Sequence, residues 1–261
     1  ILGLLPLAVI LGFIAGLIFL QPDYSASATI MILGIMLFFI AGGDWKQLIV
    51  VFLIVIVVGS AVVAATSTGK ARIEQYFNGL QDPVMGSYHI RRTFEAVIKG
   101  RMFGVGIGQA TTKFTGLPLP HTDSIFAVIA EETGIVGSFI LILLYIGMLW
   151  RGLVISKRAP DQLGSLLSFG LIAWIVMEAL MNIAVIVGLI PFTGNALPLI
   201  SAGGSSMVTT MAALGIVMNI SHSGSIVGNN ERSFAGAFVD LRGRDGRRGI
   251  SSADRGPENA N

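Results

Sequence analysis

The 261-residue chain has no cysteine, three histidines and few charged residues, and each scarcity excludes a class of protein. Without cysteine there are no disulfides and no thiolate metal sites. The histidines, His89, His121 and His222, show no metal-ligand spacing. Charged residues are 12% of the chain and hydrophobic residues 53%, whereas a soluble domain is about a quarter charged. The net charge of +2 gives no basic surface for nucleic acid, so we expect a polytopic membrane protein and no nucleic-acid partner.

Apolar runs long enough to cross a bilayer, at roughly 20 residues each, recur along the chain. They are Ile1–Leu20, Ala26–Ala41, Leu48–Ala65, Ile125–Trp150, Leu163–Ile190 and Gly203–Ile220. The runs are continuous and do not alternate as the strands of a membrane barrel do. The sequence therefore predicts an all-α, polytopic transmembrane bundle with about six spans. Because the first run opens at Ile1 with no basic residue before Lys46, we expect further segments upstream.

The order of apolar and polar segments divides the chain into four parts. Residues 1–66 hold three spans, 67–124 form one large loop, and 125–220 hold three more spans. Prolines and glycines near 188–204 predict a broken outer segment, which protein or a water-filled cavity must satisfy. Residues 221–261, rich in Gly, Ser, Arg and Asp, predict a disordered tail.

Short basic turns decide the orientation, because long loops weigh less in the positive-inside rule. These turns carry Lys46, Arg151, Lys157 and Arg158. We therefore expect a plasma-membrane protein with the turns and the C-terminal tail in the cytoplasm and the large loop outside.

One stretch of the large loop, Tyr88–Lys99, has helical periodicity and ends before Gly100. Its apolar face is Ile90, Phe94, Val97 and Ile98, and its polar face is Arg91, Arg92, Glu95 and Lys99. Two alternatives stay open: an amphipathic helix on the membrane surface, or a helix packed on its own bundle.

A proline-rich string, Leu117–Ser124, leads into the fourth apolar run and carries Asp123. Asp123 has two interpretations of equal weight, a plain helix N-cap or a functional acid, because a carboxylate at this depth is costly unless it pairs or works. Glu131 and Glu132 lie further inside the same run and are functional hypotheses for the same reason, although one of them could pair with a loop arginine.

Glycine clusters and one polar pair supply the remaining candidates. Gly104–Gly108 is better explained as a turn that lets the backbone approach the bilayer than as a nucleotide loop, although Lys113 beyond it could meet a phosphate. Gly203–Ser206 opens a helix whose N–H groups suit an anionic headgroup, or provides helix-packing glycines. Glu178 and Asn182 share a helix face, either towards a cavity or as a hydrogen-bonded pair.

The string His121–Gly137 resembles the signature of the SEDS family, the FtsW, RodA and SpoVE proteins. Other segments resemble that family in the same order: Gln21–Asp23, Phe77–Asn78, Asp82–Pro83, Gly104–Gly108, Lys113, Leu117–Pro118, Asn182–Ile183 and Gly188–Pro198. The resemblance covers about residues 20–220. The chain departs from the family pattern at Tyr24–Ser25, at Ser124 where Phe is usual, and at Ala202 where Tyr is usual.

The resemblance implies a ten-span protein of which these are the last six spans. It implies a peptidoglycan glycosyltransferase that polymerises lipid II into glycan strands for division or elongation, working with a class B penicillin-binding protein in the lipid membrane. Asp123 matches the family's essential acid, and as a general base it would take the proton of the acceptor hydroxyl. A carboxylate-held Mg²⁺ or Mn²⁺ between Asp123 and a lipid diphosphate is the one cofactor considered. The expected substrate-binding residues are His121, Thr122, Lys113, Arg91, Arg92, Glu131, Gly203, Gly204, Ser205 and Ser206.

Other functions remain as alternatives. A lipid-linked-precursor flippase would use the same cavity and loop without a base, and would tolerate Asp123→Asn better than a transferase. A serine protease built on Ser205 or Ser206 needs a histidine in a neighbouring span, and no apolar run contains one. A membrane glycan ligase would share the layout but not the His121–Asp123 string.

Overall fold

The computed structural model describes residues 4–21, 23–81 and 88–244, and over these residues the chain forms helices and turns with no strand. The helices are α1 (Leu4–Leu20), α2 (Tyr24–Ile40), α3 (Trp45–Ala65), α4 (Ser67–Gln81), α5 (Tyr88–Gly100), α6 (Ile125–Lys157), α7 (Gln162–Ile186) and α8 (Gly204–Arg244). The predicted all-α polytopic bundle is confirmed.

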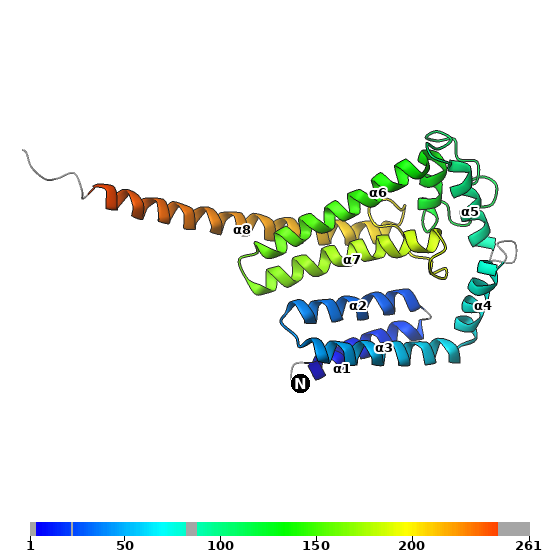
Figure 1. Cartoon of the computed structure of the whole chain (residues 1–261), viewed down its shortest axis with the longest axis horizontal. Helices are drawn as coiled ribbons and strands as arrows, with labels where there is room; N and C mark the ends of the chain where they lie inside the picture. Colours follow the sequence, from blue (N-terminus) through cyan, green and yellow to red (C-terminus); the bar gives the residue numbers. More distant parts are fainter. Residues whose placement is uncertain (1–3, 22, 82–87, 245–261) are drawn as a thin grey trace, which may run out of the picture.

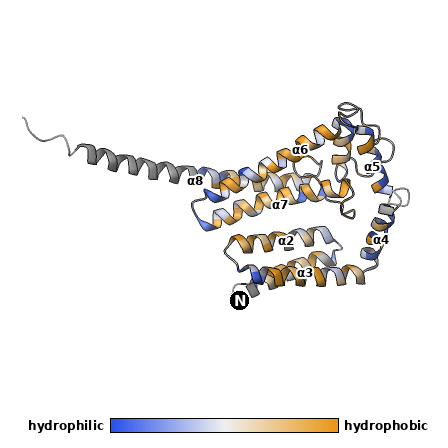
Figure 2. Ribbon diagram, viewed as in Figure 1, coloured by the Kyte–Doolittle hydropathy of each residue, from blue (hydrophilic) through white to orange (hydrophobic). Residues whose placement is uncertain are grey.

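Four helices of the described part are long and apolar enough to cross a membrane: α3, α6, α7 and the Gly204–Gly224 portion of α8. The apolar helices α1 and α2 are shorter, at 17 residues each. Helix α7 is the most enclosed of these elements, because it packs against α2, α6 and α8. Figure 2 shows the apolar residues running along α2, α3, α6 and α7.

Helices α4 and α5 run across the ends of the long helices instead of alongside them (Figure 1). Helix α4 lies in a part of the loop for which no helix was predicted. Helix α5 buries Ile90, Thr93 and Ala96 and packs on α6 and α7, while Ile98 on the same helix is 72% exposed. Of the two alternatives for this segment, packing on its own bundle is the one observed.

Helix α6 is interrupted at Gly134, whose φ of 70° and ψ of −166° are not helical. Glycine reaches this region of backbone space without the steric cost that other residues meet. The loop segment 101–106 fills the break with backbone hydrogen bonds: Val105 N to Glu131 O (3.0 Å), Gly106 N to Glu132 O (3.1 Å), Ile135 N to Arg101 O (3.0 Å) and Val136 N to Met102 O (3.2 Å). The predicted single span from Ile125 is therefore two helices, a short one over 125–133 and a long one from 135.

The connection between α7 and α8, residues 187–203, is non-helical. It lies in the stretch where the sequence predicts a broken segment.

Helix α8 continues to Arg244. The tail predicted to be disordered from residue 221 is therefore helical as far as that residue. A helix already started in the bundle extends at low cost, because each added residue gains one hydrogen bond. The rest of that prediction, residues 245–261, lies outside the described residues.

Candidate active site

Asp123 lies in the loop two residues before the first helical residue of α6, Ile125, and its side chain is half-buried. The N-cap residue of α6 is Ser124, and its side chain makes no capping hydrogen bond. Asp123 is therefore not the N-cap, and its role as a functional acid stays a prediction.

The backbone around Asp123 is held by hydrogen bonds to the carbonyl oxygens of three consecutive residues, 121–123. Their hydrogen bonds are Ala202 N to His121 O (2.9 Å), Ser201 Oγ to Thr122 O (2.7 Å) and Asn182 Nδ2 to Asp123 O (2.8 Å). The donors come from α7 and from the 187–203 segment, elements far apart in sequence from the loop. These bonds hold the main chain of the loop against α7 and the 187–203 segment.

The carboxylate itself faces the turn at Gly194. That glycine has φ +71°, and a Cβ built on it would lie 3.4 Å from Asp123 Oδ2. Burial raises the pKa of Asp123, and a hydrogen bond from the Thr122 side chain lowers the pKa in part. A carboxylate with a raised pKa accepts a proton more readily than an exposed one.

Other contacts anchor the 187–203 segment beside the acid. The Asn182 amide also donates to Asn195 O, and the Ser25 hydroxyl of α2 donates to Asn195 Oδ1 at 2.7 Å. Tyr145 of α6 donates its hydroxyl to Pro198 O at 2.5 Å. Glu178 instead accepts from Trp174 Nε1 at 3.0 Å, so the hydrogen-bonded pair considered for Glu178 and Asn182 is not the observed arrangement.

Glu131 is 1% exposed and lies in the short helix that precedes the break. Its carboxylate accepts the backbone amides of Thr111 (3.0 Å) and Thr112 (3.3 Å) and both of their hydroxyl groups. The carboxylate oxygens expected to contact substrate are therefore occupied by the loop. We assign Glu131 to holding that loop.

Lys113 pairs with Glu132, at 2.9 Å from Nζ to Oε1, and also donates to Gly108 O at 3.2 Å. The expected partner of one of these glutamates was a loop arginine, and a loop lysine takes that place. In this structure the charge of Lys113 is paired with that of Glu132. The glycine turn brings the loop backbone close to α6, because a Cβ on Gly104 would collide with the Glu132 carbonyl oxygen.

The remaining cationic candidates lie on α5. Arg92 Nη1 is 2.7 Å from Glu95 Oε2, and Arg92 Nε donates to the Tyr88 hydroxyl at 3.2 Å. Arg91 is exposed. Of the two arginines, Arg91 and Arg92, Arg91 is the more exposed to solvent.

The start of α8 adjoins the acid-bearing loop through the Ala202–His121 hydrogen bond. Helix α8 begins at Gly204, and Gly204 and Ser205 are exposed. The first amides of a helix have no intrahelical acceptor, and the helix dipole favours an anion there. His121 is exposed next to this helix end and Thr122 is half-buried. The structure thus brings His121, Thr122, Asp123 and the 203–206 amides together.

A metal held by the protein alone does not fit this site, because no three His, Asp or Glu side chains converge within the described residues. Asp123 could supply one ligand, and the other oxygens would have to come from substrate and water, as is common for Mg²⁺.

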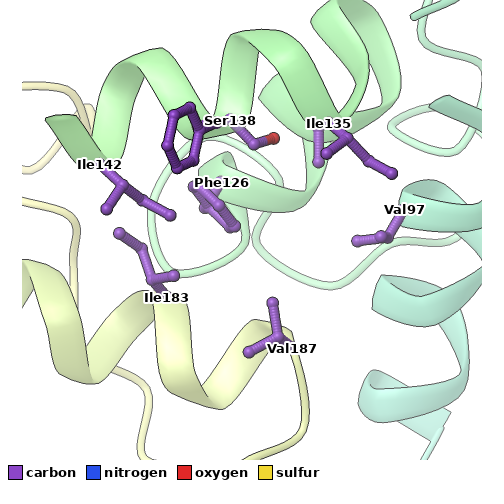
Figure 3. A pocket seen from close by; sticks show the side chains of 9 residues that line it. Val97, Phe126, Ile135, Ser138, Ile142, Ile183 and Val187 are labelled. Atoms are coloured by element: carbon purple, nitrogen blue, oxygen red, sulfur yellow. The ribbon is translucent and has the colours of Figure 1, made fainter. Parts of the chain in front are cut away.

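An apolar cavity of about 210 Å³ lies near the short helix of α6 (Figure 3). Its wall includes Val97 of α5, Phe126, Ile135 and Ile142 of α6, and Ile183 and Val187 of α7. Asp123 does not line this cavity. Its lining suits hydrocarbon and not the polar chemistry expected at the acid.

Several residues of the site were not singled out from the sequence. His89 of α5 contacts Ser124, with 2.8 Å between Nε2 and Oγ, and Ser201 and Asn195 support the loop as described above. No spacing in the sequence marks His89 or Ser201, because their roles depend on contacts across the fold. The departures at Tyr24–Ser25 and Ser124 were the only hint, since Ser25 and Ser124 both bond into this region.

The fold and the site together define a class: a polytopic membrane protein whose large loop folds back onto the bundle and places a half-buried carboxylate between three chain segments. Within that class, the chain belongs to the FtsW/RodA/SpoVE family of cell cycle proteins, whose model matches residues 2–226.

Curated relatives and solved structures agree with this assignment. Stage V sporulation protein E of Bacillus subtilis (strain 168) is 36% identical over 205 residues, covering 78% of this chain and 56% of that protein. A probable peptidoglycan glycosyltransferase FtsW of Thioalkalivibrio sp. (strain K90mix) is 38% identical over 215 residues, covering 81% of this chain and 54% of that protein. The chain thus spans a little over half the length of these relatives.

Among solved structures, a chain described under "Structural coordination of polymerization and crosslinking by a peptidoglycan synthase complex" matches with a TM-score of 0.67 and 27% identity, covering 84% of this chain and 61% of that one. The rod shape determining protein RodA of Thermus thermophilus matches with a TM-score of 0.55 and 25% identity, covering 83% of this chain and 55% of that one.

Proposed function

We propose that the protein containing this chain is a peptidoglycan glycosyltransferase that polymerises lipid II, with Asp123 as its general base. The observation that carries the proposal is the half-buried Asp123 carboxylate in a member of this family, on a loop whose backbone carbonyls at 121–123 accept hydrogen bonds from α7 and the 187–203 segment. The names of the relatives, peptidoglycan glycosyltransferase among them, favour this function over the flippase alternative.

The reaction joins a sugar 4-hydroxyl to the anomeric carbon of a sugar activated by a lipid-linked diphosphate. In it Asp123 takes the hydroxyl proton as the new C–O bond forms, and the diphosphate leaves with the electrons of the bond that breaks. Burial raises the pKa of Asp123, which supports the role of proton acceptor. His121 and Thr122 lie next to Asp123 on the loop that would meet the acceptor sugar.

The departing diphosphate needs positive charge or N–H donors. The exposed amides at the start of α8 and the exposed Arg91 are the groups we assign to it. A Mg²⁺ or Mn²⁺ ion held by Asp123 and diphosphate oxygens would supply the same stabilisation. Lys113, Arg92 and Glu131 are not included, because their partners are already in the protein.

We further propose that the large loop lies outside the plasma membrane and the tail in the cytoplasm, with a class B penicillin-binding protein as partner. The short basic turns support this orientation. The match to a chain of a peptidoglycan synthase complex supports the partner.

The test is polymerisation of lipid II by the full-length protein with its partner, comparing wild type, Asp123→Ala and Asp123→Asn. We expect polymer from wild type and none from either variant. A matched control is Asp161→Asn, because Asp161 is exposed, caps α7 by accepting from Gly164 N at 3.2 Å, and an asparagine caps equally well. Undiminished polymerisation by Asp123→Ala would refute the base assignment. Lipid transport without polymerisation would instead return the flippase alternative.

A further inference from the structure

Ser124, the residue directly after Asp123, departs from the family pattern and is completely buried. Its hydroxyl oxygen lies 2.7 Å from Pro118 O and 2.8 Å from His89 Nε2. A serine stands where the family resemblance leads one to expect phenylalanine, and its hydroxyl contacts an imidazole ring. That ring belongs to α5, outside the loop that carries the acid.

The proton arrangement in this contact follows from the chemistry of the three groups. The Pro118 carbonyl can only accept, so the single Ser124 hydroxyl proton is donated to it. His89 must then donate its Nε2 proton to the Ser124 oxygen. The ring is thereby fixed as the Nε2–H tautomer, in the order His89 to Ser124 to Pro118.

The other side of the same ring contacts the segment opposite Asp123. The His89 and Phe192 ring centroids are 3.9 Å apart, with the planes tilted by 41°. Phe192 precedes the turn at Gly194, which faces Asp123 Oδ2. His89 therefore touches both chain segments between which the acid lies.

We propose that His89 and Ser124 are positioning residues of this site, linking the acid-bearing loop to the 187–203 segment through the His89–Ser124–Pro118 hydrogen bonds and the His89–Phe192 stack. The catalytic part of this inference rests on the proposed glycosyltransferase function. Neither side chain exchanges a proton with substrate. They set the distance between Asp123 and the turn at Gly194, and so the space in which the acceptor hydroxyl must lie.

The geometry can be tested without any activity. In ¹⁵N spectra of the full-length, histidine-labelled protein in nanodiscs, we expect His89 to be the neutral Nε2–H tautomer at pH 7. Burial lowers the pKa of His89 to about 4, which agrees with a neutral ring. The variant His89→Phe assigns the signal, and Ser124→Ala should change the Nε2 resonance and the tautomer ratio. A charged ring, an Nδ1–H tautomer, or a spectrum indifferent to Ser124→Ala would overturn the linkage.

The catalytic consequence is tested with lipid II polymerisation per folded molecule. His89→Phe keeps the stack and removes the donor, and we expect kcat to fall about tenfold with KM unchanged, the effect of one hydrogen bond. Ser124→Ala should give the same loss. The double variant should be no worse than either single variant, because both remove one interaction. His89→Gln, whose amide also presents an N–H donor, should recover part of kcat.

Each outcome separates the two levels of the inference. Additive losses in the double variant, or unchanged kcat in folded single variants, would overturn the positioning role. If the two residues had only a structural role, the variants would have a lower thermal stability, and kcat per folded molecule would equal that of wild type. His89→Gln would then have no loss of kcat to recover. Wild-type protein with the expected His89 spectrum but no polymerisation would sink the proposed function and leave the linkage standing.

Discussion

Replacing Glu131 should loosen the large loop around Thr111 and Thr112 from the short helix of α6. The Glu131 carboxylate is 1% exposed and accepts hydrogen bonds from the amides and the hydroxyls of Thr111 and Thr112. Hydrogen bonds to a charged acceptor contribute about 1.5–3 kcal/mol each, and they are not additive in a shared cluster. Glu131→Ala leaves the buried Thr112 amide and hydroxyl without their acceptor. We expect this loop to lose about 3–5 kcal/mol of local stability, the range for removing one partner of a buried charged interaction.

Glu131→Gln is the graded comparison. Its amide oxygen still accepts from one or two of the donors, but its NH₂ group faces the other donors. The expected loss is about 1–2 kcal/mol, one hydrogen bond or slightly more.

Hydrogen exchange measured by mass spectrometry on the full-length protein in nanodiscs reads this stability directly. Because each 1.4 kcal/mol is tenfold, residues 105–112 should exchange roughly 100-fold faster or more in Glu131→Ala and roughly tenfold faster in Glu131→Gln. Peptides from α7 should be unchanged. Glu95→Gln is the control, since Glu95 pairs with Arg92 and Lys99 on the surface of α5. Equal exchange of residues 105–112 in wild type and Glu131→Ala would refute the reasoning.

Four shorter predictions follow. Because the pKa of His89 in the folded protein is lowered to about 4 from 6.5, the unfolded state binds the extra proton between these values. Stability should therefore rise with pH from about 4 to about 6.5 in wild type, and this slope should be weaker in His89→Phe when thermal unfolding is followed across that range. Gly194→Ala places a Cβ beside Asp123 Oδ2 on a residue whose φ is +71°. Because a left-handed backbone costs alanine roughly 1–2 kcal/mol, this variant should polymerise at least about tenfold more slowly. Full activity would show that the turn tolerates a side chain. A single cysteine at the exposed Phe114 should react with an impermeant maleimide added outside cells, and one at Arg158 should not, once any other cysteines are replaced; the reverse pattern would invert the proposed topology. Thorough chelation should stop polymerisation and Mg²⁺ or Mn²⁺ should restore it, whereas full activity in chelator would remove the metal from the mechanism.

Much of the fold could be predicted from the sequence because hydrophobicity in a membrane protein is a local property. A run of about 20 apolar residues commits itself to the bilayer whatever lies beside it. The broken segment after α7 was also visible, since the prolines and glycines of residues 188–204 leave no helix to form. The break in α6 was not visible, because Gly134 sits in an uninterrupted apolar run and its conformation depends on the loop segment that bonds into it.

The roles of the charged residues depended on the fold even more strongly. From the sequence, Lys113 and Glu131 were candidates for substrate contact, and Glu132 was a functional hypothesis without a stated role. The fold gives each of them a partner within the protein, because Thr111 and Thr112 bond to Glu131 and Lys113 pairs with Glu132.

For Asp123, too, one part of the description follows from the sequence and another part only from the fold. Its motif and neighbours in sequence determined that Asp123 belongs to a family signature at the entrance to a span. Only the tertiary structure decided that it is not a helix cap, that Asn182, Ser201 and Ala202 hold its backbone, and that His89 reaches it through Ser124. The physical reason is that membrane insertion is decided by a side chain's own transfer energy, whereas hydrogen bonds are decided by which distant groups the fold brings within 3 Å.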